Sequence, residues 1–478
     1  MSVHRLGSML AAYSLVGLGF SATILLSQRY LPVSAPSPSA QETGGPRGGS
    51  AAMVPPASPT PIPTAEVDPA KNLDVILDLL HQEYLSQVND RALFESSFKL
   101  LKEYLKSQKI DTKGLPEMPA KNVVDRALLT ASWNQLIEAC VVRCKGKFDR
   151  QKLIYLSMKC MLGALNDPYC TVLEPREFRV FEEHMTGGNF SGIGVMIEVD
   201  REHKNRITVA QPIEGSPASK AGLQTGDVLE KIDGHSTSGW DIEKAANHIR
   251  GPQGSVVQLS LFRPKEKRRF ELGVKREMIH VRSCSSKMAG PKIGYISVSV
   301  FAEETSKEFE EEVAKVKAQG AEKLVLDLRN NGGGYINAAI DICSHFVDKG
   351  ETVVSVVNPR LGRSEEHKSL GKEEISWPCV VLVNRFSASA SEITAGCLKD
   401  HKRAKLVGET TFGKASVQQV EKLLDGGAFK YTVAHYLTPS GKDIHRKGIG
   451  ADIVVKLSDK DKDDKGLQVA IKTLQDAR

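Results

Sequence analysis

The apolar positions of the chain change their period along its length, and this change divides it into regions. In residues 71–187 apolar side chains recur at spacings of three and four, as at Leu73, Ile76 and Leu80. This spacing places them on one face of a helix. Three further segments have the composition or period of a helix: residues 123–136, 152–165 and 175–185. We therefore expect an all-α region before residue 188.

Residues 276–478 follow a different pattern, in which short apolar runs alternate with longer segments of helical composition. The strand-like runs are residues 293–300, 323–328, 380–383 and 431–436, and the helical segments are residues 306–319, 336–347, 392–402 and 466–474. Alternation of this kind favours an α/β fold with a largely parallel sheet. The predicted fold class is therefore multi-domain, with an N-terminal helical region and an α/β core.

The first seventy residues have neither pattern. Residues 6–28 carry no charge and are flanked by Arg5 and Arg29, a length that suits one membrane span. We expect a membrane anchor in residues 1–30; the alternative is a cleaved signal peptide, although no A-x-A site follows. Residues 31–70 are rich in Pro, Ser and Gly and bury too little apolar surface to fold, so we expect a linker there.

Composition limits the classes of function. With 478 residues, the chain has room for two or three domains. The net charge of +6 is small for this length, and basic residues interleave with acidic ones, so no surface for nucleic acid is visible. The eight cysteines form no C-x-x-C pair and there is no H-E-x-x-H motif. We therefore expect no metal site and no cofactor.

The candidate chemistry lies in residues 378–419. The apolar run at 380–383 leads into the small residues S-A-S-A-S at 387–391, and the helical segment 392–402 follows. A sharp turn from strand to helix can hold a nucleophile exposed, and the helix N-terminus favours developing negative charge. No histidine lies within the turn, but Lys414 follows in the next loop. A lysine that burial keeps neutral can act as the base.

Three other interpretations of this stretch stay open. Small residues at the start of a helix are commonly an N-cap and a tightly packed turn. The sequence G-x-x-x-x-G-K at 408–414 also has the outline of a phosphate-binding P-loop, but Ala415 stands where that motif needs Ser or Thr, and no suitable helical segment follows. A Ser–His–Asp hydrolase would need a histidine near the turn, and the spacing of His401 along the helix points it away.

The same stretch resembles the signature of the carboxyl-terminal processing proteases, also called tail-specific proteases. The resemblance lies in F-S-A-S-A-S-E-I at 386–393 and G-E-T-T-F-G-K at 408–414. It implies a serine endopeptidase with a serine–lysine dyad, in which Ser389 is the nucleophile and Lys414, 25 positions later, is the base. It further implies that Gln418 helps to orient the lysine.

Two other motifs carry the resemblance. The sequence D-L-R-N-N-G-G-G at 327–334 is close to the family's D-L-R-x-N-x-G-G. It implies an oxyanion hole formed by the backbone amides of Gly334 and Ala390, with a plain tight turn as the alternative at Gly334. The sequence D-P-Y-C-T at 167–171 resembles the family's D-P-Y-S-T turn, with Cys170 in place of serine.

Residues 188–275 resemble a PDZ domain, in which we expect residues 240–250 to form the second helix. The opening F-S-G-I-G-V at 190–195 matches the loop whose backbone amides capture the terminal carboxylate of a peptide, and the next strand offers an edge to that peptide. A small β-barrel without a ligand is the alternative. The substrate-binding residues that the resemblance implies are Ser191, Gly192, Ile193 and Gly194.

The resemblance therefore implies an endopeptidase that recognises exposed, apolar C-terminal tails of proteins through its PDZ domain and cleaves near the C-terminus. The PDZ domain would act either as a tether or as a gate, and a PDZ scaffold without catalysis is the alternative function. Free lysine has a pKa of about 10.4, so we expect burial beside Phe412, away from acids, to lower that of Lys414. The family's usual location implies the periplasmic side of an inner membrane.

Overall fold

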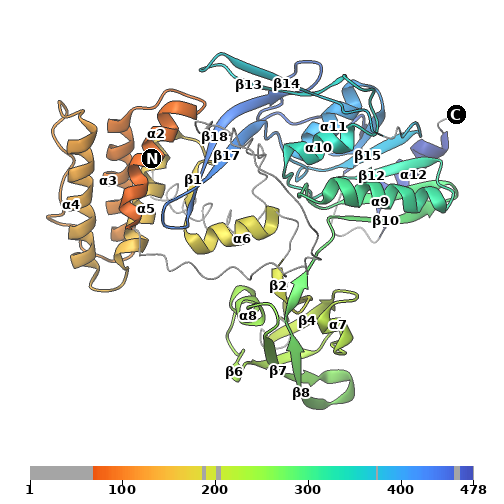
Figure 1. Cartoon of the computed structure of the whole chain (residues 1–478), viewed down its shortest axis with the longest axis horizontal. Coiled ribbons are helices and arrows are strands. Elements are labelled where there is room, and N and C mark those ends of the chain that lie inside the picture. Colours follow the sequence, from red (N-terminus) through yellow and green to blue (C-terminus); the bar gives the residue numbers. More distant parts are fainter. Residues whose placement is uncertain (1–67, 186–189, 201–205, 373–374, 457–462, 477–478) are drawn as a thin grey trace, which may run out of the picture. The chain divides into compact units, whose positions relative to one another are not determined.

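The computed structural model describes residues 68–185, 190–200, 206–372, 375–456 and 463–476 (Figure 1). The expected anchor at residues 6–28 and nearly all of the expected linker at 31–70 lie outside these ranges. Across the ranges that the structure describes, none of the helices has the length and apolarity of a membrane span. The membrane anchor therefore stays a prediction. By their contacts, the described residues divide into two compact units.

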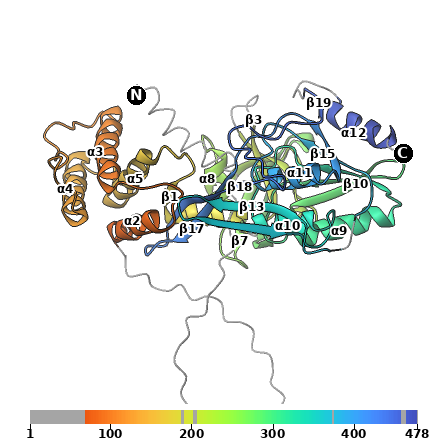
Figure 2. The ribbon, with the colours of Figure 1, turned by 90° about the horizontal axis from the view of Figure 1, so that it is seen from above.

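The smaller unit, which we call the helical unit, combines residues 68–175 with residues 418–433. Its four α-helices are α2 (Asn72–Glu83), α3 (Asp90–Ser107), α4 (Arg126–Cys144) and α5 (Arg150–Leu162). Helices α3, α4 and α5 lie side by side (Figure 1, Figure 2). Each of these three begins after a residue whose side chain accepts a hydrogen bond from the first turn: Asn89, Asp125 and Asp149. The predicted helical region is confirmed.

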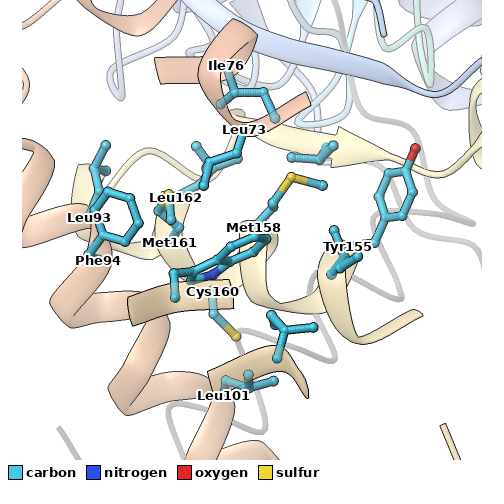
Figure 3. Packing of buried hydrophobic residues seen from close by; sticks show 14 of the residues in the cluster. Leu73, Ile76, Leu93, Phe94, Leu101, Tyr155, Met158, Cys160, Met161 and Leu162 are labelled. Carbon is cyan, nitrogen blue, oxygen red and sulfur yellow. The ribbon is translucent and has the colours of Figure 1, made fainter. Parts of the chain in front are cut away.

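One apolar cluster forms the core of the helical unit. Leu73 of α2, Phe94 of α3 and Met158 of α5 are buried in it (Figure 3). Trp133 of α4 is also fully buried, and its indole N–H lies 2.8 Å from the hydroxyl oxygen of Ser157. The one polar atom of this large side chain therefore has a partner inside the core.

Two strands from near the C-terminus contribute to the helical unit. Strands β17 (Ser416–Lys422) and β18 (Ala428–Leu437) pair with each other, and β1 (Thr171–Leu173) pairs antiparallel with the first half of β18 (Figure 2). Residues 418–433 thus pack with residues that precede them by more than 240 positions, Lys430 opposite Thr171 among them. A division of the chain in sequence order does not give this arrangement, because pairing between distant strands leaves no local signal.

The larger unit contains a six-stranded sheet in the order β10-β11-β12-β15-β16-β19, which is parallel except for β10 (Figure 1). The strands are β10 (Cys284–Gly290), β11 (Ile293–Val298), β12 (Lys323–Asp327), β15 (Cys379–Val383), β16 (Ala404–Gly408) and β19 (Ile453–Val454). All five positions of β15 are buried. Burial on both faces is characteristic of a parallel sheet, and the predicted α/β class is confirmed.

Helices cover both faces of this sheet. On one face, α12 (Lys465–Asp476) buries Ala470 and Leu474 against the strands. On the other, α9 (Thr305–Ala318) lies so close to β11 that a Cβ atom at Gly294 would be 3.0 Å from Val316. Helix α10 (Ile336–Cys343) follows β12, and α11 (Ala390–Asp400) follows β15. Because neighbouring parallel strands end at the same edge, the loops after β12 and β15 meet there.

Two antiparallel strands that the sequence pattern does not predict complete the core of the larger unit. They are β13 (Thr352–Asn358) and β14 (Arg363–Lys368). Strand β13 also pairs with the end of β18 through residues 355–357 and 435–437. This pairing fixes the end of β18, which carries Tyr436, within the larger unit.

The PDZ-like segment has an apolar core of its own, in which its strands pack against the helices α7 and α8. Its sheet has the order β3-β4-β5-β7-β8, with β6 paired to β5. The elements are β3 (Val195–Asp200), β4 (Arg206–Pro212), α7 (Pro217–Lys220), β5 (Val228–Ile232), β6 (His235–Ser236), α8 (Ile242–Ile249), β7 (Val256–Arg263) and β8 (Arg268–Lys275). Helix α8 agrees with the second helix expected at 240–250. Outside this sheet, β2 (Phe190–Gly192) pairs with β9 (Glu277–Ile279), just beyond the expected boundary at residue 275.

Candidate active site

Ser389 lies in the turn between β15 and α11, directly before the first residue of the helix. Its backbone has φ 62° and ψ −118°, a conformation that few residues other than glycine adopt. Backbone strain of this size persists only where the surrounding structure holds it, and it concentrates at functional sites. At this position the side chain also lies at the positive end of the helix dipole. The turn thus has the form of a nucleophile elbow.

Lys414 lies in the loop between β16 and β17, and its side chain is 0% exposed. Burial disfavours the charged form of a lysine, which is the property that a general base needs. The expectation that Phe412 provides this burial is wrong, because the side chain of Phe412 is 54% exposed. The expectation that acids lie away from the amine of Lys414 stays a prediction; the carboxylate of Glu392 accepts a hydrogen bond from the backbone N–H of Lys414.

Glu392 joins the two segments of the site. Its Oε2 atom accepts hydrogen bonds from the backbone N–H of Ser389 and from the backbone N–H of Lys414, both at 2.9 Å. Its Oε1 atom accepts from the hydroxyl of Thr411 at 2.6 Å and from the N–H of Gly413 at 2.7 Å. Burial raises the pKa of Glu392, whereas the four donors favour the carboxylate. One side chain therefore fixes the separation of the predicted nucleophile and base.

Tyr436 contacts the backbone carbonyl groups of Ser389 and Lys414. Its hydroxyl oxygen lies 2.9 Å from the carbonyl oxygen of Lys414 and 3.2 Å from that of Ser389, and it can donate its proton to either. Sequence reasoning assigned no role to Glu392 or Tyr436. For Glu392 a signal was available, because it stands three residues after Ser389, in the N3 position of a capping box.

The glycine loop after β12 lies against the nucleophile turn. A Cβ atom at Gly333 would be 2.7 Å from Cβ of Ser389 and 2.9 Å from the backbone nitrogen of Ala390. Gly334 has φ 147°, and a Cβ atom there would lie 2.1 Å from a backbone oxygen, so both positions require glycine. The N–H of Gly333 donates to the side chain of Asn331 at 2.8 Å. Of these two amides, that of Gly334 is therefore the candidate for an oxyanion hole with Ala390.

The predicted site includes contacts of Lys414 with the side chains of Ser389 and Gln418. The hydroxyl of Ser389 has no hydrogen-bond partner in the part of the chain that the structure describes, so it is not bonded to Lys414. Gln418 lies on β17, in the portion of that strand that belongs to the helical unit, and its side chain is buried. The Nε2 atom of Gln418 donates to the hydroxyl oxygen of Thr432 at 3.3 Å.

The predicted peptide-binding residues lie at the start of the PDZ-like segment. Ser191 and Gly192 are on β2, opposite residues 277–278 of β9. Ile193 is fully buried in the apolar core of the segment. Gly194 has φ 71°, and a Cβ atom there would be 2.4 Å from that of Ser216. Strand β3 is the last strand of its sheet, so it offers the edge that an extended peptide needs.

Two of the alternative interpretations disagree with the geometry. The P-loop interpretation requires a helix directly after Lys414, but strand β17 begins at Ser416. The Ser–His–Asp interpretation requires a histidine at the nucleophile, but Nε2 of His401 lies 2.8 Å from the carbonyl oxygen of Thr352. Asp400 accepts a hydrogen bond from Thr438 and so holds a turn. Among the described residues, no cluster of His, Cys, Asp and Glu is arranged to hold a metal.

Comparison with known families agrees with this geometry. Residues 292–455 match the family described as peptidase family S41. These residues are therefore similar to peptidase family S41. The matched range contains β12, the nucleophile turn and Lys414, so both segments that Glu392 joins lie within it. Residues 208–263 match the PDZ domain family, which agrees with the second core described above.

Several known proteins are similar to this chain. The carboxy-terminal processing protease CtpA of Bacillus subtilis (strain 168) is 37% identical over 313 residues, 66% of this chain and 66% of that protein. A probable CtpA-like serine protease of Staphylococcus aureus (strain COL) is 37% identical over 310 residues, 65% of this chain and 61% of that protein. The chain thus spans just under two thirds of the length of these relatives. In the solved structure of a photosystem II D1 C-terminal processing protease, 97% of the chain aligns with 84% of this one, at 27% identity and a TM-score of 0.43.

The role of Glu392 predicts the effect of replacing it with glutamine. In Glu392→Gln the NH₂ group faces at least one backbone N–H donor in either orientation of the amide, so we expect the free energy of unfolding to fall by roughly 1–3 kcal/mol. Denaturant unfolding measures this change, with the exposed Glu303→Gln as a matched control. Equal stability of the two variants would contradict the role assigned to Glu392.

Proposed function

We propose that the chain is a serine endopeptidase that uses Ser389 as its nucleophile and Lys414 as its general base. The observation that carries this proposal is the shared contact with Glu392, whose one oxygen atom accepts from the backbone N–H of both residues. The match of residues 292–455 to peptidase family S41 supports it. So do the similar proteins, which are named as carboxy-terminal processing or serine proteases.

The proposed reaction begins with the neutral amine of Lys414. The amine takes the proton of the Ser389 hydroxyl while the hydroxyl oxygen attacks the scissile carbonyl. The backbone amides of Gly334 and Ala390 stabilise the negative charge on the carbonyl oxygen. Protonated Lys414 then gives its proton to the leaving amine, and water hydrolyses the acyl-enzyme. Catalytic hydrogen bonds are often long without substrate, which accounts for the unpartnered hydroxyl of Ser389.

The third member of the proposed site is Gln418. The carbonyl oxygen of a glutamine side chain is an acceptor, and an amine needs an acceptor to hold it in one orientation. In this proposal Gln418 directs the amine of Lys414 toward Ser389. Lys414 lies two residues before the start of β17, and Gln418 follows it by four residues, on the strand itself. The side chain of Gln418 is fully buried.

We further propose that the PDZ domain recognises exposed C-terminal tails of the protein substrates. The free edge of β3 supports this, because an added peptide would pair its main chain there. The amides after β2 would bind the terminal carboxylate. Burying an apolar last residue such as Leu or Val contributes roughly 1.5–3 kcal/mol, whereas burying a charge in its place costs free energy.

Replacing the dyad tests the proposed chemistry. Ser389→Ala and Lys414→Ala should each abolish cleavage of an unfolded protein while the far-UV circular dichroism stays that of the parent. Lys414→Arg should also be inactive, because arginine does not lose its proton at usable pH. In the parent, kcat should rise with pH as more of the lysine amine becomes neutral. Substantial cleavage by the Lys414→Ala protein would refute the dyad.

Two substrates that differ only at the tail test the PDZ proposal. An unfolded protein that ends in Leu-Val should have a KM about 10-fold or more below that of the same protein with a charged tail. Deleting residues 188–279 removes the segment together with the β2–β9 pair. Loss of this preference with retained peptide cleavage indicates a tether, and higher unregulated activity indicates a gate. A variant that folds and keeps the full preference would contradict both.

We also propose a location for the enzyme. We place the peptidase on the periplasmic side of an inner membrane, held by residues 6–28, because that uncharged stretch has the length of one span. A reporter enzyme that is active only after export should be active when it is fused after Pro69. An inactive fusion would overturn this assignment.

A further inference from the structure

A chain of hydrogen bonds ends on Gln418, entirely within the helical unit. The hydroxyl of Thr432 donates to the Oδ2 atom of Asp167 at 2.6 Å. The Nε2 atom of Gln418 donates to the same hydroxyl oxygen at 3.3 Å. Thr432 and Gln418 are 2% and 0% exposed, so these two members are shielded from water, and Asp167 is half-buried. The proposed catalysis assigns no role to Asp167 or Thr432.

The strand pairing places these residues together. At the turn of the β17–β18 hairpin, the N–H of Leu423 donates to the carbonyl oxygen of Gly427 at 2.9 Å. Gln418 precedes Leu423 by five residues and Thr432 follows Gly427 by five residues. In an antiparallel pair this places Gln418 opposite Thr432. Residues directly opposite each other in an antiparallel pair have neighbouring side chains. The contact between the amide and the hydroxyl is therefore a consequence of the register.

Asp167 is held rigidly at the other end of the chain. Its Oδ1 atom accepts from the backbone N–H of Tyr169 at 2.9 Å. Besides Thr432, its Oδ2 atom accepts from the thiol of Cys170 at 3.2 Å and from the hydroxyl of Tyr84 at 3.3 Å. These donors come from the end of α2, from the turn before β1 and from β18, so the carboxylate cannot move without disturbing three elements.

The chemistry of these groups fixes the direction of every hydrogen bond. An ionised carboxylate only accepts, so the single proton of the Thr432 hydroxyl points to Asp167. The Thr432 oxygen can then only accept from Gln418, which requires the NH₂ group of the amide to face it. Oxygen and nitrogen of such an amide are told apart by their hydrogen bonds, and Asp167 settles the choice. The carbonyl oxygen of Gln418 must face away from Thr432.

We propose that Asp167 and Thr432 are positioning residues that fix the amide of Gln418 in the orientation in which its carbonyl oxygen serves the lysine base. This inference rests on the proposed function, in which that oxygen accepts from the amine of Lys414. If the amide were reversed, its NH₂ group would donate to the lone pair of the neutral amine, which must be free to take the proton of Ser389. Asp167 thereby contributes to catalysis from a distance.

Other titratable groups face Asp167 from the elements around it. Burial, above all, raises the pKa of Tyr84 and of Cys170, so both stay protonated and act as donors. Burial lowers the pKa of Lys430 to about 8, against the opposing effect of Cys170 and Asp167. Lys430 therefore changes its charge within the working range of a pH profile. Any such profile must be compared with that of a Lys430→Met variant.

The first test removes and restores the hydroxyl of Thr432 in the full chain. Thr432→Val should lower kcat for an unfolded protein substrate by about 10-fold or more with KM unchanged, because a misplaced base slows only the chemical step. Thr432→Ser keeps the hydroxyl and should restore most of kcat. Thr171→Val, on the strand that pairs with β18, is the matched control, because its hydroxyl donates to the backbone carbonyl of Val172 and not to Asp167. Equal kcat in Thr432→Val and the parent would overturn the inference.

The second test reverses the chain of hydrogen bonds. Asp167→Asn should place its NH₂ group at the Oδ2 position, since the N–H of Tyr169 requires an acceptor at the other. The Thr432 hydroxyl would then donate to Gln418 and turn its amide over. We expect Asp167→Asn to lower kcat at least as much as Thr432→Val, and to move the midpoint of its pH profile to lower pH, since a reversed amide disfavours the lysine ammonium. A midpoint equal to that of the parent, under the Lys430→Met comparison, would count against the inference.

Combined variants separate this role from a structural one. In a Gln418→Ala background, Thr432→Val and Asp167→Asn should cause no further loss of kcat, because their effect passes through Gln418. Losses that persist in that background would refute the inference. Lys414→Ala distinguishes the two proposals. If it retains cleavage, the proposed function itself fails; if it is inactive while Thr432→Val equals the parent, only the role of Asp167 and Thr432 fails.

Discussion

The site depends on the buried carboxylate of Glu392. A charged group without contact with water is unfavourable unless donors surround it, and Glu392 has four. Two of these donors are the backbone amides of Ser389 and Lys414, which lie on different loops. Satisfying one carboxylate therefore forces two loops into a single arrangement. Tyr436 adds a constraint on the carbonyl side of the same two residues.

The parallel sheet makes this arrangement available. Strands β12 and β15 are neighbours, so the glycine loop that follows one and the nucleophile turn that follows the other leave the same edge. Glycine at positions 333 and 334 then allows backbone to approach backbone more closely than any side chain would permit. The left-handed φ of Ser389 is kept by this close packing. The strained backbone of Ser389 and the close approach of the glycine loop therefore lie at the same place in the fold.

In the helical unit, the carboxylate of Asp167 is also surrounded by hydrogen-bond donors. Asp167 accepts four hydrogen bonds, one of which fixes the hydroxyl of Thr432 and hence the direction of the Gln418 amide. The carboxylates of Glu392 and Asp167 both act only as hydrogen-bond acceptors, because an ionised carboxylate has no proton to donate. Each therefore determines the orientation of the groups that face it. Such networks are costly when partly satisfied and specific when complete.

The sequence by itself determined the helical region and the α/β class, because each leaves a local signal in period and composition. Its resemblance to known motifs indicated the PDZ segment, the candidate residues of the dyad and Gly334 as a candidate for the oxyanion hole. Only the tertiary structure decided what surrounds Lys414, where Phe412 lies exposed and Glu392 lies close. It alone placed residues 418–433 with the helical unit. The reason is physical: contacts between distant segments depend on how strands pair and on which buried polar atoms must find partners, and neither is written in a local pattern.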